Sequence, residues 1–298
     1  MSEHNGKTQM NITNRAKPHA VALETTLLVH GVPTSASRPL ADNLSSIVQN
    51  EGAHPCLIGV VNGSPTAGMT NDELTHMLDG HEILKANTAN LGVAMHKGLD
   101  AATTVSTTME ISAAAGIKVF ATGGIGGVHK DYGNHLDISS DLAAFTRFPV
   151  AVVTSGVKSI LDVTATREAL ETLGILVIGY QTDSFPAFYL RESSAGVDVR
   201  IDDPDELASF VNFELERTRR GIVVANPIPH QDELDADHWN DLLAAAEEHA
   251  KDSGAQGRAM TPTILGQLHT LSNGATLDAN LALVRSNTKL AAQIASRI

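Results

Sequence analysis

A glutamate and a lysine stand in apolar stretches of the sequence, where charged side chains are costly. Glu24 interrupts the run VALETTLLV, and Lys158 directly follows VAVVTSGV. Burial favours the protonated form of a carboxyl group and the neutral, nucleophilic form of an amine. The pair therefore indicates covalent catalysis by a lysine with an acid/base partner. The alternative for each residue is a surface charge at the end of a strand.

Two aspartates four positions apart suggest a second kind of chemistry. Asp137 and Asp141 enclose Ser139 and Ser140, and on a helical turn both carboxylates would face the same side. Oxygen ligands are those that Mg²⁺ and Mn²⁺ prefer, and His129 offers a nearby imidazole. The spacing predicts a divalent cation site. The alternative is a capped helix followed by a solvated acid.

A glycine-rich segment follows one of the apolar runs. Four of five consecutive positions are glycine, namely Gly123, Gly124, Gly126 and Gly127. Such a segment is free to adopt positive φ and to bring its N–H groups close to an anion. Its spacing matches neither a P-loop nor a dinucleotide fingerprint. A tight turn is therefore the alternative to an anion site.

The elements that must position these residues are predicted by an alternation of short apolar runs with helical stretches. The runs are rich in β-branched residues, and they occupy residues 21–30, 56–61, 117–122, 150–154, 175–180, 197–201 and 221–226. Several are apolar throughout, as is typical of parallel strands covered on both faces. A helix is predicted after Asp203 because Pro204 suits the first helical position. From about residue 235 the pattern is helical only.

These patterns predict one α/β domain. We expect a three-layer α/β/α sandwich with a helical C-terminal layer over residues 19–298, preceded by a polar leader at residues 1–18. The sequence shows no internal repeat and no Pro/Ser-rich linker that would divide it.

Composition excludes several classes of function. Among 298 residues, 42% are hydrophobic and 18% are charged, which is typical of a globular protein. The formal net charge of −13 argues against binding to nucleic acid or to an anionic membrane. The single cysteine, Cys56, excludes an intramolecular disulfide. With no signal-like segment and no apolar run of the ~18 residues that a membrane helix needs, we expect a cytoplasmic protein.

Seven stretches taken together resemble the pseudouridine-5′-phosphate glycosidase family, also called the indigoidine synthase A family. They are VALETTLLVHG (21–31), TTVSTTMEISAAAGIKVFATGGIGGVH (103–129), LDISSDL (136–142), SGVKSILD (155–162), GYQTDSFPAFY (179–189), IVVANPIP (222–229) and SNGATLDANLALVRSN (272–287). The resemblance covers almost the whole chain from about residue 19. It implies a homotrimeric enzyme that reversibly cleaves pseudouridine 5′-phosphate to uracil and ribose 5-phosphate with a divalent metal, usually manganese.

The resemblance also implies a role for each candidate residue. Lys158 would form a Schiff base with C1′ of the ring-opened ribose, and Glu24 would donate and accept the proton. Asp137, with bound waters, would hold Mn²⁺ or another divalent cation such as Mg²⁺. The remaining substrate contacts would come from Lys85, Val105, Ser139, Ser140, Asp141 and Asn280.

The residue chemistry agrees with this implied reaction. An O-glycosidase can protonate a leaving oxygen, whereas a C-nucleoside has a leaving carbon that protonation alone does not release. An iminium at C1′ provides the electron sink, and its formation requires an amine nucleophile with an adjacent acid/base.

One segment departs from the family pattern. Lys85 is followed by Ala86–Asn90, with no arginine where family members commonly have a Ser-Arg-Arg-Asp-like stretch. Arginine is the preferred bidentate partner of phosphate. An alternative is therefore a relative that joins ribose 5-phosphate to an aromatic acceptor other than uracil. A third possibility, from another class, is a catalytically silent sugar-phosphate-binding protein.

Overall fold

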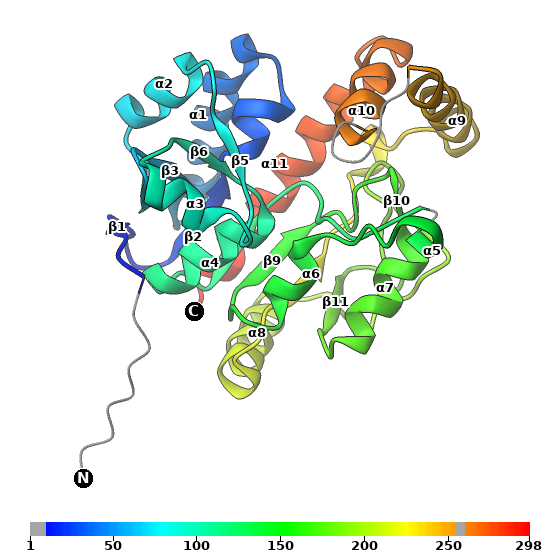
Figure 1. The fold of residues 1–298 in the computed structure, drawn as a ribbon. Coiled ribbons are helices and arrows are strands. Elements are labelled where there is room, and N and C mark those ends of the chain that lie inside the picture. Colours follow the sequence, from blue (N-terminus) through cyan, green and yellow to red (C-terminus); the bar gives the residue numbers. More distant parts are fainter. Residues whose placement is uncertain (1–9, 131, 254–259) are drawn as a thin grey trace.

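A mainly parallel sheet forms the centre of the molecule (Figure 1) in the computed structural model, which describes residues 10–130, 132–253 and 260–298. The strands along the main path are, in spatial order, β1 (Thr13–Asn14), β4 (Ser64–Ala67), β3 (His54–Val61), β2 (Ala20–Glu24), β7 (Val119–Ala121), β9 (Ala151–Thr154), β13 (Ile222–Ala225), β11 (Val177–Tyr180) and β12 (Val199–Ile201). From β3 to β12 every neighbouring pair is parallel.

The remaining strands lie beside this path. Strand β6 (Ala101–Thr103) pairs antiparallel with β3 and parallel with β5 (Leu84–Ala86). A separate two-stranded ribbon joins β8 (Val128–His129) to β10 (Leu161–Asp162). The ribbon brings the segment after the glycines next to the segment after Lys158.

Helices cover both faces of the sheet, which confirms the predicted three-layer architecture. On one face, α4 (Val105–Ala115) packs against β2, β3 and β7 with α6 (Ser140–Phe145) beside it. On the other face, α11 (Ala275–Ala295) packs against β2, β7 and β9, between α1 (Thr34–Asn50) and α8 (Pro204–Thr218). The other helical segments are α2 (Asn71–Asp79), α3 (Leu91–Lys97), α5 (Tyr132–His135), α7 (Val163–Thr172) and the 3₁₀ turn η2 (His230–Asp232).

The C-terminal part of the chain is helical, as predicted. It consists of α9 (Ala236–Asp252), α10 (Met260–Leu271) and α11. Helices α9 and α10 pack against each other away from the sheet, while α11 packs across one face of the sheet, against β2, β7 and β9 (Figure 1). Among the described residues no helix is both long and apolar enough to cross a bilayer.

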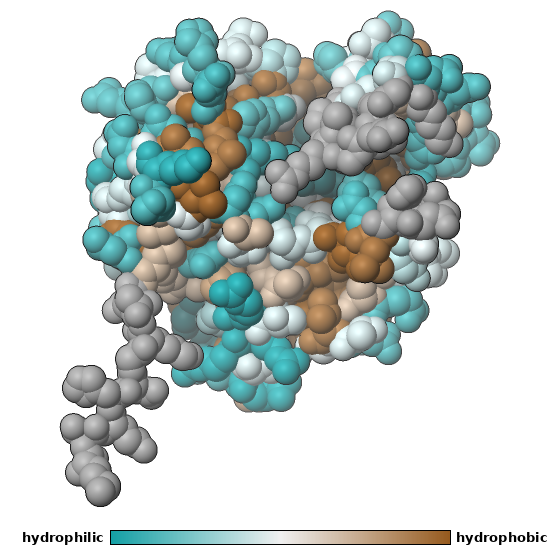
Figure 2. Space-filling model, viewed as in Figure 1, coloured by the Kyte–Doolittle hydropathy of each residue, from teal (hydrophilic) through white to brown (hydrophobic). Residues whose placement is uncertain are grey.

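The apolar runs form strands because they are covered by helices on both sides. All four residues of β9 and all four of β13 are buried, as the uninterrupted runs 150–154 and 221–226 predicted. The α8 start also matches the prediction, since the Asp203 carboxylate accepts hydrogen bonds from the N–H groups of Asp205 and Glu206 at 2.9 Å. The surface in Figure 2 is largely hydrophilic, with its apolar side chains in separate patches.

The predicted strand at 21–30 is wrong beyond Glu24. Strand β2 ends there, and a π-helical turn, η1, follows at Leu27–Gly31. The two threonines between them cause the change, because the Thr25 hydroxyl donates to the carbonyl of Ile58 at 2.9 Å and that of Thr26 to the carbonyl of Thr103 at 2.8 Å. An apolar run does not reveal such side-chain bonds to the backbone.

Part of the predicted leader belongs to the sheet. Thr13 and Asn14 form β1 and pair with Thr66 and Ala67, and Arg15 forms a two-pronged ion pair with Glu73. Residues 1–9 lie outside the described part of the chain.

Candidate active site

The predicted catalytic residues lie at the carboxyl ends of the parallel strands. Glu24 is the last residue of β2, Thr122 follows β7, and Lys158 follows β9 after a short loop. The strands that come after β2 in the sequence are added on both of its sides, β3 on one and β7 on the other. Ligand sites of α/β sheets form at such a reversal of strand order, outside the carboxyl ends of the strands.

The Glu24 carboxyl group is desolvated and partnered. Its Oε1 accepts a hydrogen bond from the hydroxyl of Thr122. Burial raises the pKa of Glu24 above its ordinary value, against the opposing effects of Lys158, the Thr122 hydroxyl and Lys85, while the charge of Asp141 adds to the rise. A glutamate in this state keeps its proton to higher pH than an exposed one, as a proton donor requires.

Lys158 is held by the pairing of two loops. Its N–H donates to the carbonyl of Ile125 at 3.1 Å, and the N–H of Ile125 donates to the carbonyl of Gly156 at 3.0 Å. The half-buried side chain packs over Gly124, where a Cβ atom would lie 3.3 Å from Lys158 Cγ and 2.6 Å from Phe188 Cδ2. The absence of a side chain at Gly124 therefore gives Lys158 its path toward Glu24.

Lys85 enters the same site from β5. Desolvation of its ammonium group is the main cause that lowers the pKa of Lys85, and the charge of Lys158 lowers it further. Glu24 and Asp141 act in the opposite direction. Two amines and two carboxyl groups from four separate segments are thus close enough to influence one another.

The prediction that Asp137 and Asp141 share one side of a helical turn is wrong. Helix α6 begins at Ser140 and is capped by the Ser139 hydroxyl, which accepts from the N–H of Asp141. Asp137 precedes that helix and is 53% exposed, whereas Asp141 is 4% exposed. The two carboxylates are therefore in different environments and cannot act as the paired ligands that their spacing suggested.

Asp141 instead fixes two backbone segments. Its Oδ1 accepts from the N–H of Ser106 at 2.9 Å, and its Oδ2 accepts from the N–H of Gly126 at 2.8 Å. The first bond places a negative charge at the N-terminus of α4, where the helix dipole favours it. The second shows that the glycine-rich loop does approach an anion, and that this anion is the protein's own carboxylate.

The four glycines serve close packing and not positive φ, because all the described residues with positive φ lie elsewhere. A Cβ at Gly126 would lie 2.3 Å from the Ser139 hydroxyl, and one at Gly127 equally close to that of Thr166. A Cβ at Gly123 would lie 3.3 Å from Oδ1 of Asn280. The loop therefore fits between α11 and the segment that leads into α6.

The remaining candidates surround this loop. Val105 is buried at the start of α4, and the Ser140 hydroxyl lies 3.2 Å from that of Ser106 in the same turn. Asn280 is half-buried on α11 on the other side of the loop. The structure thus brings the predicted residues to one end of the sheet, with Asp137 at its exposed margin.

Asp137 offers few protein ligands for a cation. Its Oδ2 lies 3.8 Å from Nε2 of His129, and among the described residues no three His, Cys, Asp or Glu side chains gather as a metal cluster. Mg²⁺, and with it the chemically similar Mn²⁺, usually retains several waters and binds through one or two carboxylates. The exposed carboxylate of Asp137 fits a cation held in that way.

The sequence pattern did not predict a buried polar network beneath these residues. Asn287 on α11 donates from Nδ2 to the carbonyl of Thr122 at 2.8 Å, and its Oδ1 accepts from Nδ2 of Asn226 at 2.9 Å. In the sequence Asn287 stands in the helical stretch LALVRSNTKLAAQIA, which also contains Arg, Ser, Thr, Lys and Gln. One more polar residue in such a stretch is typical of a solvated helix face and gives no signal of burial.

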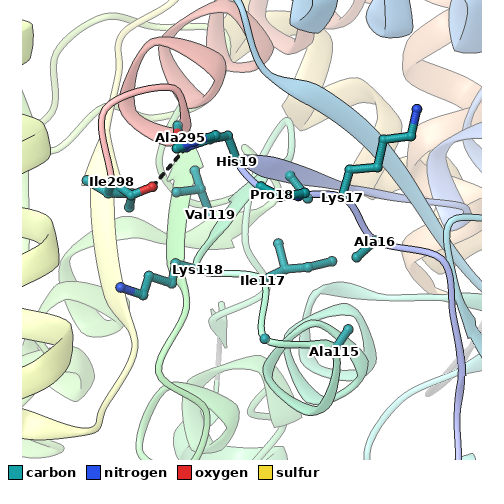
Figure 3. Close-up of a pocket in the computed structure, with 12 residues that line it drawn as sticks. Ala16, Lys17, Pro18, His19, Ala115, Ile117, Lys118, Val119, Ala295 and Ile298 are labelled. Carbon is teal, nitrogen blue, oxygen red and sulfur yellow. Dashed lines mark hydrogen bonds between the residues drawn. The ribbon is translucent and has the colours of Figure 1, made fainter.

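A cavity of about 470 Å³ lies at the opposite edge of the sheet (Figure 3). Lys17 and Lys118 line it, and Nδ1 of His19 lies 3.0 Å from the carbonyl oxygen of Ile298. His19 and Lys118 precede β2 and β7, so this cavity faces the amino ends of the strands. It is separate from the candidate active site.

A family model described as indigoidine synthase A like protein matches residues 10–297. The chain belongs to the indigoidine synthase A-like family. Two curated relatives in this family, both named pseudouridine-5′-phosphate glycosidase, come from Petrotoga mobilis and Caldanaerobacter subterraneus subsp. tengcongensis. The first is 42% identical over 92% of this chain and 90% of its own length, and the second is 43% identical over 93% and 91%. The indigoidine synthase A-like family is thus a family of enzymes, as predicted.

Two solved structures have the same fold. An indigoidine synthase A-like protein from Thermotoga maritima has a TM-score of 0.88 at 35% identity and covers 99% of both chains. Prealnumycin C-glycosynthase AlnA, solved in complex with ribulose 5-phosphate, has a TM-score of 0.87 at 33% identity and covers 93% of this chain and 91% of its own. The α/β fold is therefore shared over nearly the whole length.

Proposed function

We propose that this protein reversibly cleaves the C–C glycosidic bond of pseudouridine 5′-phosphate to give uracil and ribose 5-phosphate. The observation that carries the proposal is the convergence of Lys158 and Glu24 at the carboxyl edge of the sheet, with the pKa of Glu24 raised by burial. The names of the curated relatives support the same substrate.

Lys158 supplies the electron sink in the proposed cleavage. The C1′–O4′ bond of the ribose opens and O4′ takes a proton, while the neutral amine of Lys158 forms a bond to C1′ and loses a proton. The nitrogen lone pair then forms a C=N bond as the C1′–C5 bond breaks. The electron pair of that bond remains on C5 of uracil, which accepts a proton from Glu24. One water hydrolyses the iminium, which releases ribose 5-phosphate and regenerates the lysine.

The other groups of the site hold the sugar phosphate. Lys85 carries positive charge into the site from β5, and Ser139 and Ser140 offer hydroxyl groups beside the first turn of α4. Asn280, half-buried on α11, would contact the base. Asp137 would hold Mn²⁺ or Mg²⁺ through water ligands, and a bound cation would supply positive charge that attracts the anionic substrate and orders water.

A C-ribosylating activity is the second candidate, and the loop after Lys85 is the segment in which this chain departs from the pattern expected of the glycosidases. Asn87 Oδ1 accepts from the N–H of Ala89 at 2.9 Å, and Asn90 Nδ2 donates to the carbonyl of Lys85 at 3.2 Å. This loop is therefore closed by its own amide side chains and carries no guanidinium group. Both candidate reactions use the same sugar phosphate, so the observation that favours a changed acceptor is the similarity to AlnA, which is named a C-glycosynthase.

The reverse reaction distinguishes the two candidates. Purified protein is incubated with ribose 5-phosphate and either uracil or a larger hydroxylated aromatic ring, and the C-nucleotide formed is identified by mass spectrometry. Formation of pseudouridine 5′-phosphate supports the first proposal, and product from the aromatic ring alone supports the second. Failure of both, with sugar phosphate still bound, would instead indicate a silent binding protein.

The homotrimer implied by the family resemblance stays a prediction, which sedimentation or light scattering tests directly.

A further inference from the structure

The buried side chain of Asn287 connects α11 to the residue that contacts Glu24. We propose that Asn287 is a positioning residue, which holds the backbone of Thr122 so that the Thr122 hydroxyl meets the Glu24 carboxyl group. The inference rests on the proposed function, in which Glu24 transfers the proton, and it adds a residue that touches neither substrate nor reacting atoms.

Asn287 is fully buried and its carboxamide is used on both sides. Nδ2 donates to the carbonyl of Thr122 at 2.8 Å and to the hydroxyl of Ser155 at 3.1 Å, and Oδ1 accepts from Nδ2 of Asn226 at 2.9 Å. The Ser155 hydroxyl in turn donates to the carbonyl of Asn226 at 2.9 Å. A buried amide is tolerated only when it is satisfied in this way.

The three partners lie at the ends of three adjacent strands. Thr122 follows β7, Ser155 follows β9 and Asn226 follows β13. One side chain from α11 therefore sets the relative positions of the strand ends that lead into the site. Its reach extends to Lys158, since Ser155 begins the loop that carries this lysine.

Thr122 is fixed through both halves of its backbone. Its N–H donates to the carbonyl of Val153 at 3.0 Å, and its own carbonyl accepts from Asn287. Thr122 is itself buried, and its hydroxyl donates to Glu24. Because the peptide groups on both sides of Thr122 are hydrogen-bonded, its buried hydroxyl group is held in one orientation toward Glu24.

The bond from Thr122 matters because Glu24 lies among opposing charges. Lys158 and Lys85 favour its ionised form, Asp141 disfavours it, and the Thr122 hydroxyl favours it as well. Removal of the hydroxyl contact should therefore raise the proton affinity of Glu24. This change is visible in a pH profile, whereas a loss of packing alone is not.

The test compares Asn287→Asp with Thr288→Val in the full-length protein. N287D retains the shape and the oxygen that faces Asn226 but removes both N–H donors. Thr288 is also fully buried and adjacent on α11, and within the described part of the chain its hydroxyl has no hydrogen-bond partner, so T288V is a matched control. The readouts are kcat, KM and the pH dependence of kcat for pseudouridine 5′-phosphate, together with the melting temperature.

We expect N287D to lower kcat by about tenfold to a hundredfold, the scale of a small misplacement of catalytic groups, with little change in KM. The limb of the kcat profile that reports Glu24 should move to higher pH. Thr122→Val should shift the same limb, and Thr122→Ser, which retains the hydroxyl, should restore it. T288V should match the wild type in kcat, KM and pH dependence, and its melting temperature should be equal or higher, because the buried Thr288 hydroxyl has no partner among the described residues.

The inference would be overturned if N287D had the kcat and the pH profile of the wild type. It would also be overturned if N287D had a lower melting temperature while the limb of the kcat profile that reports Glu24 did not move. A new carboxylate alone would also raise the pKa of Glu24, so the uncharged Asn287→Ser is measured beside N287D and must move the limb in the same direction; if N287D does not fold, Asn287→Ser carries the test under the same criteria. If the wild type releases no uracil, the proposed function is refuted, but the role of Asn287 in holding Thr122 is still testable by hydrogen exchange of backbone amides. We expect faster exchange at residues 122–125 in N287D than in T288V. Equal exchange rates in the two variants would contradict the inference.

Discussion

The hydroxyl of Thr122 donates a hydrogen bond to the carboxyl group of Glu24 across two neighbouring parallel strands. The register of the sheet explains this contact, since Leu23 pairs with Ala121 and the next residue of each strand reaches the edge beside the other. The carboxyl group is thereby held at the carboxyl ends of β2 and β7, where the strand order reverses. Its proton affinity results from burial on one side and from Thr122 and the lysines on the other.

Replacement of Lys158 by alanine should abolish both turnover and covalent trapping. Borohydride reduction in the presence of ribose 5-phosphate should label the wild type at Lys158, because reduction makes a Schiff base permanent. Mass spectrometry of digested protein measures the label. Lys118→Ala is the control, since Lys118 is 43% exposed and lies at the opposite end of β7, and it should label fully. An adduct in the Lys158→Ala protein would show that another lysine is the nucleophile.

The desolvated carboxyl group of Glu24 should destabilise the fold as pH rises. Its pKa is raised in the folded state, so the unfolded chain loses this proton first, near the ordinary value of 4.5. Stability is therefore lost between that value and the raised pKa, by about 1.4 kcal/mol for each unit of the shift. Glu24→Gln should melt higher than the wild type at neutral pH, with the gain vanishing in acid. A gain that is the same at every pH would contradict the shifted pKa.

A methyl group at Gly124 should reduce activity. In Gly124→Ala the new Cβ would lie 2.6 Å from the buried Phe188 ring and 3.3 Å from Lys158 Cγ, so the ring must shift and the lysine stem beside it is displaced. A fall in kcat of about tenfold or more is expected from such a displacement. Gly92→Ala on α3 is the matched control, because nothing lies within 4 Å of its Cβ position, and it should retain full kcat. Equal kcat values for the two variants would remove the role assigned to Gly124.

Asp137→Asn should weaken the dependence of the reaction on metal. We expect the Mn²⁺ concentration for half-maximal activity to rise by about tenfold to a hundredfold, the range seen when groups that support a metal are removed. Titration of chelator-treated protein with Mn²⁺ measures it. Asp183→Asn, at a carboxylate that is 80% exposed and pairs only with Arg200 among the described residues, is the control. Full activity of the chelator-treated wild type would rule out a required cation.

The sequence predicted the layers of the fold and the region of the site, because both depend on local patterns. Uninterrupted β-branched runs marked β9 and β13, and a charge within such a run marked Glu24. The end of β2 was missed because it depends on hydrogen bonds from Thr25 and Thr26 to distant carbonyl groups.

The parts of the site that depend on tertiary contacts could not be predicted. Asp141 appeared to be a partner of Asp137 by spacing, but its carboxylate is used by the N–H groups of Ser106 and Gly126. Asn287 acquires its role only when α11 lies across three strand ends. Spacing within a segment does not report the neighbours that folding brings from elsewhere in the chain.

Release of uracil from pseudouridine 5′-phosphate tests the central claim most directly. Purified protein is incubated with the substrate, with and without Mn²⁺, and uracil is separated by chromatography and quantified beside the Lys158→Ala protein. The account predicts uracil release that requires Mn²⁺ and Lys158. Well-folded wild-type protein that releases no uracil in the presence of Mn²⁺ would contradict it.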